Sequence, residues 1–184
     1  MKKVKTCALV IGHKKSSPGA VNQSQHLSEF DYNEQLALEI EASLSDNKKV
    51  KVQRIYRRTY SALPDDINAL NPDFIICLHC NAFNTKATGT EVLFYHRSKK
   101  GKKFAKVLDK NLVKALELTN RGIKAKTTED RGGYLLKQTN APCLISEPFF
   151  IDNNHDLEVA ESKRTELVNA YVKSIQKMAC ILSK

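Results

Sequence analysis

Three titratable side chains stand at the ends of short apolar runs. His13 and His79 each directly follow such a run, and Glu147 ends a third. Runs of this length are typical of strands buried in a parallel sheet. Because ligands in open α/β sheets bind beyond the carboxyl ends of the strands, we expect these side chains to face one crevice. Histidine and glutamate gathered in this way indicate a zinc hydrolase.

A third zinc ligand is needed beside the two histidines, because a catalytic zinc usually has three protein ligands and one open position. Glu29 and Glu34 are the candidates, since both lie near the start of a predicted helix. The polar loop over 14–28 is long enough to bring this helix start back to the sheet edge. The residues alone leave the choice between Glu29 and Glu34 open, and they also allow that the histidines are merely structural.

Glu147 lies in an unusually apolar segment. Its neighbours include Ile145, Pro148, Phe149 and Phe150. Loss of water around a carboxyl group raises its pKa. A raised pKa suits a general base that later acts as an acid near neutral pH. The alternative is a surface carboxylate where a strand leaves the sheet.

The elements that must position these side chains alternate between strand and helix. Strands are predicted over 4–12, 50–56, 73–79, 90–95 and 142–147, and helices over 30–45, 62–70 and 101–119, with a loop at Gly132-Gly133 and a last helix whose apolar stripe runs from Leu167 to Leu182. This order predicts an α/β fold, a three-layer sandwich in which helices flank a mostly parallel, twisted sheet. The length of 184 residues predicts a single domain over 1–184, with no separate binding domain.

The net charge of +10 predicts a polyanionic partner or surface, although it also fits simple solubility. Five lysines gather at the start of one predicted helix, namely Lys99, Lys100, Lys102, Lys103 and Lys106. If they attract an anionic wall, activity should fall with ionic strength. If they only form a solvated helix face, activity should not depend on salt.

The five cysteines are an odd number, and three of them lie inside apolar runs, which favours free thiols in a reducing compartment. Cys77 and Cys80 have the spacing of half a zinc knuckle, but the sequence has no second such pair. The charged start at Met1–Thr6 is followed by too short an apolar stretch for a signal peptide, and no stretch is long enough to span a membrane.

Five segments, taken in order, resemble the zinc-dependent N-acetylmuramoyl-L-alanine amidases of the type 3 family, which cut peptidoglycan. These segments are Gly12-His13 with Pro18-Gly19-Ala20, Glu29 with Asn33 and Leu36-Ala37, Cys77 through Ala82, Gly89-Thr90-Glu91, and Pro142 through Asn153. Three departures are Cys77 in place of serine, Cys80 in place of a small residue, and Lys14-Lys15 in place of a glycine-rich pair.

The resemblance implies that His13, Glu29 and His79 bind Zn²⁺ and that Glu147 is the catalytic base. It implies hydrolysis of the amide between N-acetylmuramic acid and L-alanine. Peptidoglycan is then the expected partner of a monomeric protein that binds no nucleic acid. Arg121, Arg131 and Asn81 are plausible contacts for the stem peptide.

A small, unsignalled amidase resembles a phage endolysin, made in the host cytoplasm and acting on the wall after release; a bacterial enzyme exported by another route is the alternative. Three rival functions are a zinc peptidase on a related scaffold, a basic nucleic-acid-binding protein, and a wall-binding module without catalysis. The sequence lacks paired His-x-x-Glu ligands and nucleic-acid-binding motifs. Product analysis on muropeptides separates an amidase from a peptidase.

Overall fold

The computed structural model describes residues 3–183, so Met1, Lys2 and Lys184 lie outside the described part of the chain. The elements in chain order are β1 (Lys5–Ile11), β2 (Val21–Asn22), β3 (Leu27–Ser28), α1 (Glu29–Ser43), β4 (Val50–Tyr56), α2 (Leu63–Ala69), β5 (Phe74–Leu78), β6 (Thr90–Tyr95), α3 (Lys99–Leu116), β7 (Asn120–Lys126), α4 (Gly133–Gln138), β8 (Cys143–Glu147), α5 (Asn154–Ser162) and α6 (Arg164–Leu182). These elements build one α/β domain.

Six strands form a sheet in the order β4-β1-β5-β8-β6-β7. The first four are parallel to one another, whereas β6 runs antiparallel to β8 and parallel to β7. The sheet is therefore mostly parallel, as predicted. In the part of the chain that the structure describes, no helix is both long and apolar enough to cross a membrane.

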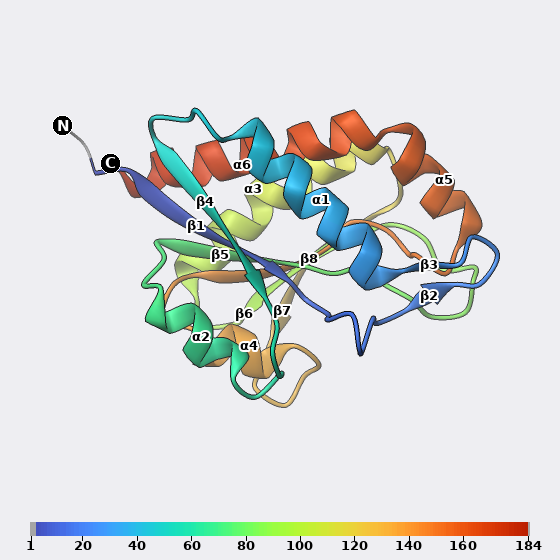
Figure 1. Ribbon diagram of the computed structural model, residues 1–184, viewed down its shortest axis with the longest axis horizontal. Helices are drawn as coiled ribbons and strands as arrows, with labels where there is room; N and C mark the ends of the chain where they lie inside the picture. The colour runs from blue at the N-terminus through green and yellow to red at the C-terminus, as the bar shows by residue number, and fades with distance from the viewer. Residues whose placement is uncertain (1–2, 184) are drawn as a thin grey trace.

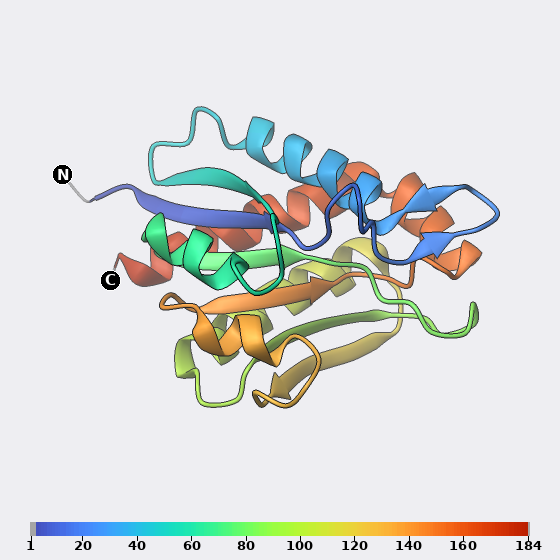
Figure 2. The same cartoon turned by 60° about the horizontal axis from the view of Figure 1, so that its bottom comes forward.

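Helices cover both faces of this sheet, which makes the domain a three-layer sandwich (Figure 1). The helices α1, α3 and α6 lie on one face, and α2 and α4 lie on the other, in front of the sheet in Figure 2. Alternate residues of β1 enter two different cores: Leu9 packs with the first group of helices and Val10 with the second. Because both faces of a central strand are buried, its sequence is a continuous apolar run rather than an alternating one.

The register of the parallel strands brings the predicted site residues to one edge. Ile11 is paired with Leu78, and Leu78 is paired with Ser146. The residues that follow these positions are Gly12, His79 and Glu147, so His13, His79 and Glu147 leave the sheet side by side.

Beyond shifts of one or two residues at element ends, the structure differs from the predicted elements mainly outside the central strands. The helix predicted over 101–119 spans Lys99–Leu116 and ends where Glu117 adopts a left-handed conformation, with φ of 57°. Gly133, predicted to lie in a loop, begins α4. The predicted loop over 14–28 contains the short hairpin β2–β3, and β7 and α5 were not predicted. These additions lie outside the four parallel strands that position the site.

Candidate metal and catalytic site

His13 and His79 approach each other from neighbouring strands. Their ring centroids are 5.0 Å apart, and the two side chains are 15% and 18% exposed. The Nδ1 of His13 lies 3.3 Å from the backbone oxygen of Ser17, so an Nδ1–H donated there leaves Nε2 free as a ligand. The ring of His79 lies against Gly12, where a Cβ atom would overlap the imidazole. The glycine before His13 therefore makes room for the second histidine.

Glu29 reaches the histidines because it is the first residue of α1. Ser28 caps this helix, and its hydroxyl accepts a hydrogen bond from the Asp31 backbone N–H. The preceding Pro18-Gly19-Ala20 segment turns back along the helix start: the Glu29 N–H donates to the Ala20 carbonyl at 2.8 Å, and the Ala20 N–H donates to Glu29 Oε2 at 3.1 Å. The Cys80 N–H donates to Oε1 at 3.0 Å. The carboxylate is thus held from both sides.

The three side chains form one compact cluster of potential ligand atoms. One atom from each of His13, Glu29 and His79 lies within 4.8 Å of the others. Glu29 Oε1 is 2.8 Å from His79 Nδ1, and Glu29 Oε2 is 3.3 Å from His13 Nε2. Burial lowers the pKa of His13. Burial alone would raise the pKa of Glu29, but its hydrogen bond to His79 and the charge of both histidines lower it. Both shifts favour the forms that bind metal, a neutral imidazole and a carboxylate.

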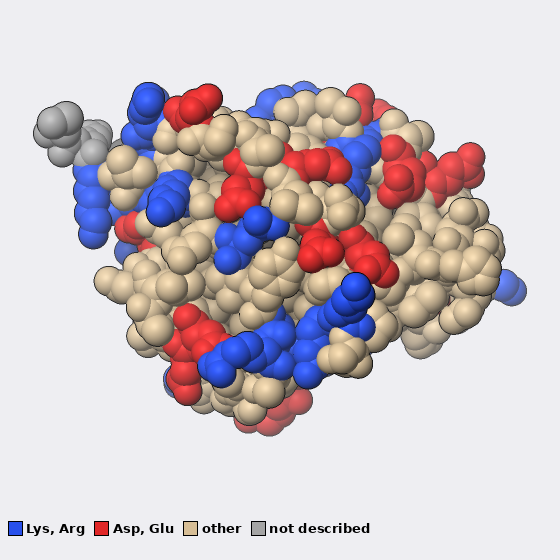
Figure 3. All heavy atoms as spheres, viewed as in Figure 1, with Lys and Arg blue, Asp and Glu red and all other residues tan. Residues whose placement is uncertain are grey.

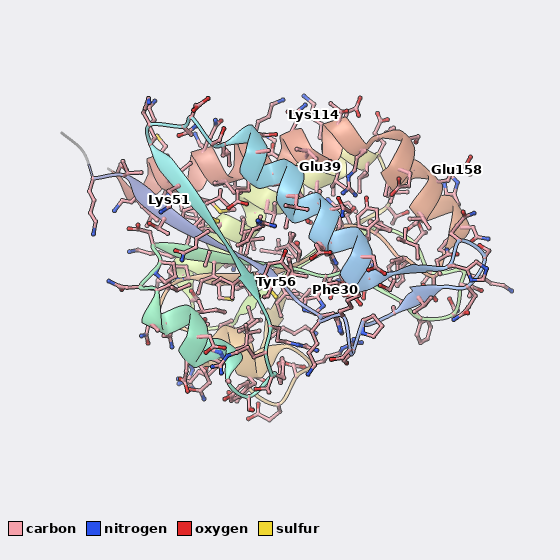
Figure 4. The ribbon with its side chains drawn as sticks, viewed as in Figure 1. Phe30, Glu39, Lys51, Tyr56, Lys114 and Glu158 are labelled. Atoms are coloured by element: carbon pink, nitrogen blue, oxygen red, sulfur yellow. The ribbon has the colours of Figure 1, made fainter. Side chains whose placement is uncertain are left out.

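Glu34, the other candidate ligand, lies elsewhere. It lines a separate depression on the outer side of α1 together with Asp31 and Glu39. Glu34 also lies near Tyr56, which Figure 4 labels at the end of β4. Partial burial and this carboxylate together raise the pKa of the Tyr56 hydroxyl. The structure therefore brings Glu29, and not Glu34, to the two histidines.

Glu147 lines the same crevice as His13 and His79. Its Oε2 atom is buried and has no hydrogen-bond partner among residues 3–183. Burial raises the pKa of Glu147 to about 8, partly offset by the charge of His79. The desolvation predicted from the sequence is therefore present, and the carboxyl group is free to exchange a proton with a bound molecule.

Glu91 is the cross-strand partner of Glu147 in the pairing of β6 with β8. Its two oxygens are engaged elsewhere. Oε1 accepts a hydrogen bond from Asn81 Nδ2 at 3.1 Å, and Oε2 accepts one from Arg121 Nε at 3.0 Å. Arg121 also lies over the ring of Phe150 at 5.0 Å. Of the plausible stem-peptide contacts, Asn81 and Arg131 line the crevice, whereas Arg121 braces Glu91.

The crevice that these groups line has a volume of about 470 Å³. One wall comes from the segment between β4 and α2, which includes Arg57 and Tyr60, and from the segment between β7 and α4, which includes Glu129 and Arg131. In Figure 3, basic side chains gather over these segments, and acidic ones gather around α1. Of this wall, the sequence suggested Arg131 as a contact but not Arg57 or Tyr60, because these two belong to a polar loop without a recognisable motif.

Residues 7–177 match the sequence profile of Amidase_3, the family described as N-acetylmuramoyl-L-alanine amidase. The chain belongs to this family. Among its relatives, a probable cell wall amidase, LytH, of Staphylococcus saprophyticus is 29% identical over 163 residues, which are 88% of this chain and 53% of that protein. The chain also matches an uncharacterized cell wall amidase of Bacillus anthracis, with 29% identity over 92 residues, which are 46% of this chain and 16% of that protein. It thus spans about half, or less, of the length of these relatives.

Solved amidase structures share the fold. N-acetylmuramoyl-L-alanine amidase from Clostridium difficile 630 superposes with a TM-score of 0.85 over 95% of this chain and 96% of that one, at 20% identity. The catalytic domain of the CD27L endolysin targeting Clostridia difficile superposes with a TM-score of 0.77 over 96% and 97% of the two chains, at 25% identity. These likenesses confirm the fold class predicted for this chain.

Proposed function

We propose that the chain hydrolyses the amide bond between N-acetylmuramic acid and L-alanine in peptidoglycan, and that it uses zinc to do so. The observation that carries the proposal is the cluster of His13, Glu29 and His79 beside the free carboxyl group of Glu147. Membership of the amidase family supports the substrate, and the donor set supports the metal.

The residues present fit a zinc ion. Two imidazoles and one carboxylate are a ligand set that catalytic zinc sites use, with an open fourth position. His13 Nε2 is buried and has no hydrogen-bond partner within the described residues. A buried polar atom without a partner destabilises the folded state unless a cation or a proton binds to it. Ligand atoms on one tetrahedral zinc lie about 3.4 Å apart, since each bond is about 2.0–2.2 Å. One atom from each of the three side chains lies within 4.8 Å of the others, which is close enough for a single ion to contact all three.

Each protein group then has a defined task. Zinc, when bound, polarises the amide carbonyl and lowers the pKa of water toward about 7. Glu147 takes a proton from the attacking water and delivers it to the leaving L-alanine nitrogen. Its raised pKa, about 8, suits a group that must both accept and release a proton near neutral pH. The packing of Gly12 and the cap at Ser28 hold the ligands in place.

Product analysis tests this proposal. Purified peptidoglycan is incubated with zinc-loaded protein, with protein treated with a chelator, and with the His79→Ala variant. We expect new L-alanine amino termini and intact glycan strands from the zinc-loaded protein alone. New amino termini inside the stem peptide would instead indicate a zinc peptidase, and new reducing sugar ends would indicate a glycosidase.

We also propose that the chain acts as a phage endolysin, made in the host cytoplasm and reaching the wall after release. Its likeness to the catalytic domain of an endolysin supports this role. The test is expression inside a bacterium whose purified walls the protein digests. Cultures should grow normally until the membrane is permeabilised and should then clear, whereas cells that express Glu147→Gln should not. Clearing without permeabilisation would contradict the proposal.

A further inference from the structure

Arg57 stands at the same sheet edge as the proposed metal ligands. It directly follows β4, and the register pairs Tyr56 with Ile11 on the neighbouring strand β1. Arg57 is therefore the cross-strand neighbour of the segment Gly12-His13. Neighbouring strands lie about 4.8 Å apart, so the guanidinium reaches the crevice that His13 enters. Arg57 lines this crevice, and its positive charge contributes to the lowered pKa of His13.

Arg57 has no carboxylate partner in the described part of the chain, unlike its sequence neighbours Arg54 and Arg58. Arg54 pairs with Glu41 at 2.5 Å, and Arg58 pairs with Asp66 through two contacts of 2.5 and 3.1 Å. Within residues 3–183, Arg57 forms no ion pair, and its Nε atom is buried without a hydrogen-bond partner. A buried N–H of a charged group that lacks an acceptor is costly. Such a group is free to receive an anion.

Two acidic side chains of the crevice, Glu91 and Asp130, are committed to other partners. Glu91 accepts from Asn81 and Arg121. Asp130 accepts from the backbone N–H and the hydroxyl of Thr127, at 2.6 and 3.0 Å. These contacts hold both carboxylates away from Arg57. The positive charge beside His13 therefore remains available to a ligand in the cavity.

We propose that Arg57 binds the free α-carboxylate of the second stem-peptide residue and thereby makes the chain selective for stems in which D-isoglutamate is not amidated. This inference rests on the proposed function, because the scissile amide must lie at the metal. The α-carboxylate is two residues beyond that amide, a reach of about 7 Å. A cavity of about 470 Å³ has room for such a dipeptide. The planar guanidinium can bind a carboxylate through two parallel hydrogen bonds, which an amide cannot accept equally.

Two substrates that differ only in this group test the proposal: N-acetylmuramoyl-L-alanyl-D-isoglutamate and its D-isoglutamine counterpart. Hydrolysis of each by the zinc-loaded protein is followed over a range of concentrations. We expect the isoglutamate compound to be favoured about 10- to 100-fold in kcat/KM, mostly through KM, because hydrogen bonds between charged groups have this strength. Arg57→Gln should remove the preference by lowering kcat/KM for the isoglutamate compound, while kcat/KM for the isoglutamine compound stays unchanged. Arg57→Lys should keep part of it.

Arg58→Gln is the matched control, since Arg58 is the next residue but is exposed and paired with Asp66; it should keep the full preference. Equal hydrolysis of both substrates by the unaltered protein, or a preference that survives Arg57→Gln, would overturn the proposal.

A binding measurement separates this inference from the proposed function. N-acetyl-L-alanyl-D-isoglutamate and its isoglutamine counterpart are titrated into zinc-free protein by calorimetry. Tighter binding of the isoglutamate compound, lost in Arg57→Gln, supports the role of Arg57 even if neither muramoyl substrate is hydrolysed. Equal binding of the two compounds in this measurement would contradict the role of Arg57, whatever the hydrolysis assay shows.

Discussion

Gly19 and Glu29 are packed so closely that no side chain fits between them. A Cβ atom on Gly19 would lie 2.5 Å from Glu29 Oε2 and 2.8 Å from the ring of His13. Gly19 also has a φ of 84°, which favours glycine. The glycine thus sets the relative position of two proposed zinc ligands although it contacts no metal itself.

Gly19→Ala should weaken zinc binding by at least about tenfold, because moving a ligand or its support typically costs this much. Gly122→Ala is the matched control. Gly122 has a similar φ of 77°, but the nearest atom to its Cβ position is 4.0 Å away. Both substitutions introduce a similar backbone strain, so only Gly19→Ala should lose affinity for zinc. A competition assay with a chelating dye measures this affinity. Equal zinc affinities for the two variants would contradict the steric role of Gly19.

The stability of the metal-free protein should fall as the pH rises from about 5 to about 8. Burial raises the pKa of Glu147 from 4.5 to about 8 in the folded protein, so the folded state binds a proton more tightly than the unfolded chain. The resulting stability is fully present below the unfolded pKa and is lost as the pH rises through the folded pKa. Denaturant titrations should give a loss of about 1 to 3 kcal/mol that is absent in Glu147→Gln. Identical pH profiles for the two proteins would rule out this titration.

Chelation of zinc should lower the thermal midpoint of the protein. A ligand present at a thousand times its Kd stabilises the folded state by about 4 kcal/mol, which corresponds to roughly 10 °C for a domain of this size. Scanning calorimetry with and without a chelator measures the shift. His79→Ala should unfold at the same temperature in both conditions; a comparable shift in this variant would mean that zinc binds elsewhere.

Asp156 should matter for stability rather than for metal binding. It is fully buried, and its carboxylate accepts hydrogen bonds from the Thr88 hydroxyl at 2.5 Å and from the Gly89 and Phe150 N–H groups at 3.0 Å each. Asp156→Asn replaces one acceptor with a donor and should cost about 2 to 4 kcal/mol. Asp46→Asn, at an exposed position, is the control and should change the free energy of unfolding by less than about 0.5 kcal/mol. Urea titration of both variants provides the comparison.

The sequence predicted the central strands well, because burial on both faces leaves a clear signature. The predicted strands 4–12, 73–79 and 142–147 match β1, β5 and β8 to within one residue at each end. The edge strand Val50–Tyr56 was predicted from its alternating pattern instead, with the bounds that the structure has. The strand β7 was missed, since Asn120–Lys126 lies at the sheet edge and none of its residues is fully buried. The helix α5 was also missed, although Asn153 caps its first turn and offered a signal.

The site was predictable in part for a similar reason. His13, His79 and Glu147 follow or end buried strands, so the parallel register alone brings them together. The choice of Glu29 over Glu34 depended on the family resemblance, because the position of Glu29 depends on how the Pro18-Gly19-Ala20 turn folds back onto α1. Nothing in the sequence distinguishes Arg57 from Arg58. The two differ in the folded protein, where Arg58 pairs with Asp66 and no described residue forms an ion pair with Arg57.

The zinc content and turnover of Glu147→Gln test the central claim most directly. In the proposed mechanism Glu147 transfers the proton, whereas His13, Glu29 and His79 would hold the metal. Elemental analysis should therefore find one zinc per chain in the variant, as in the unaltered protein. Release of L-alanine amino termini from purified peptidoglycan should fall at least about 100-fold, the usual contribution of a general base. A variant that keeps its zinc and digests peptidoglycan at the original rate would contradict the account.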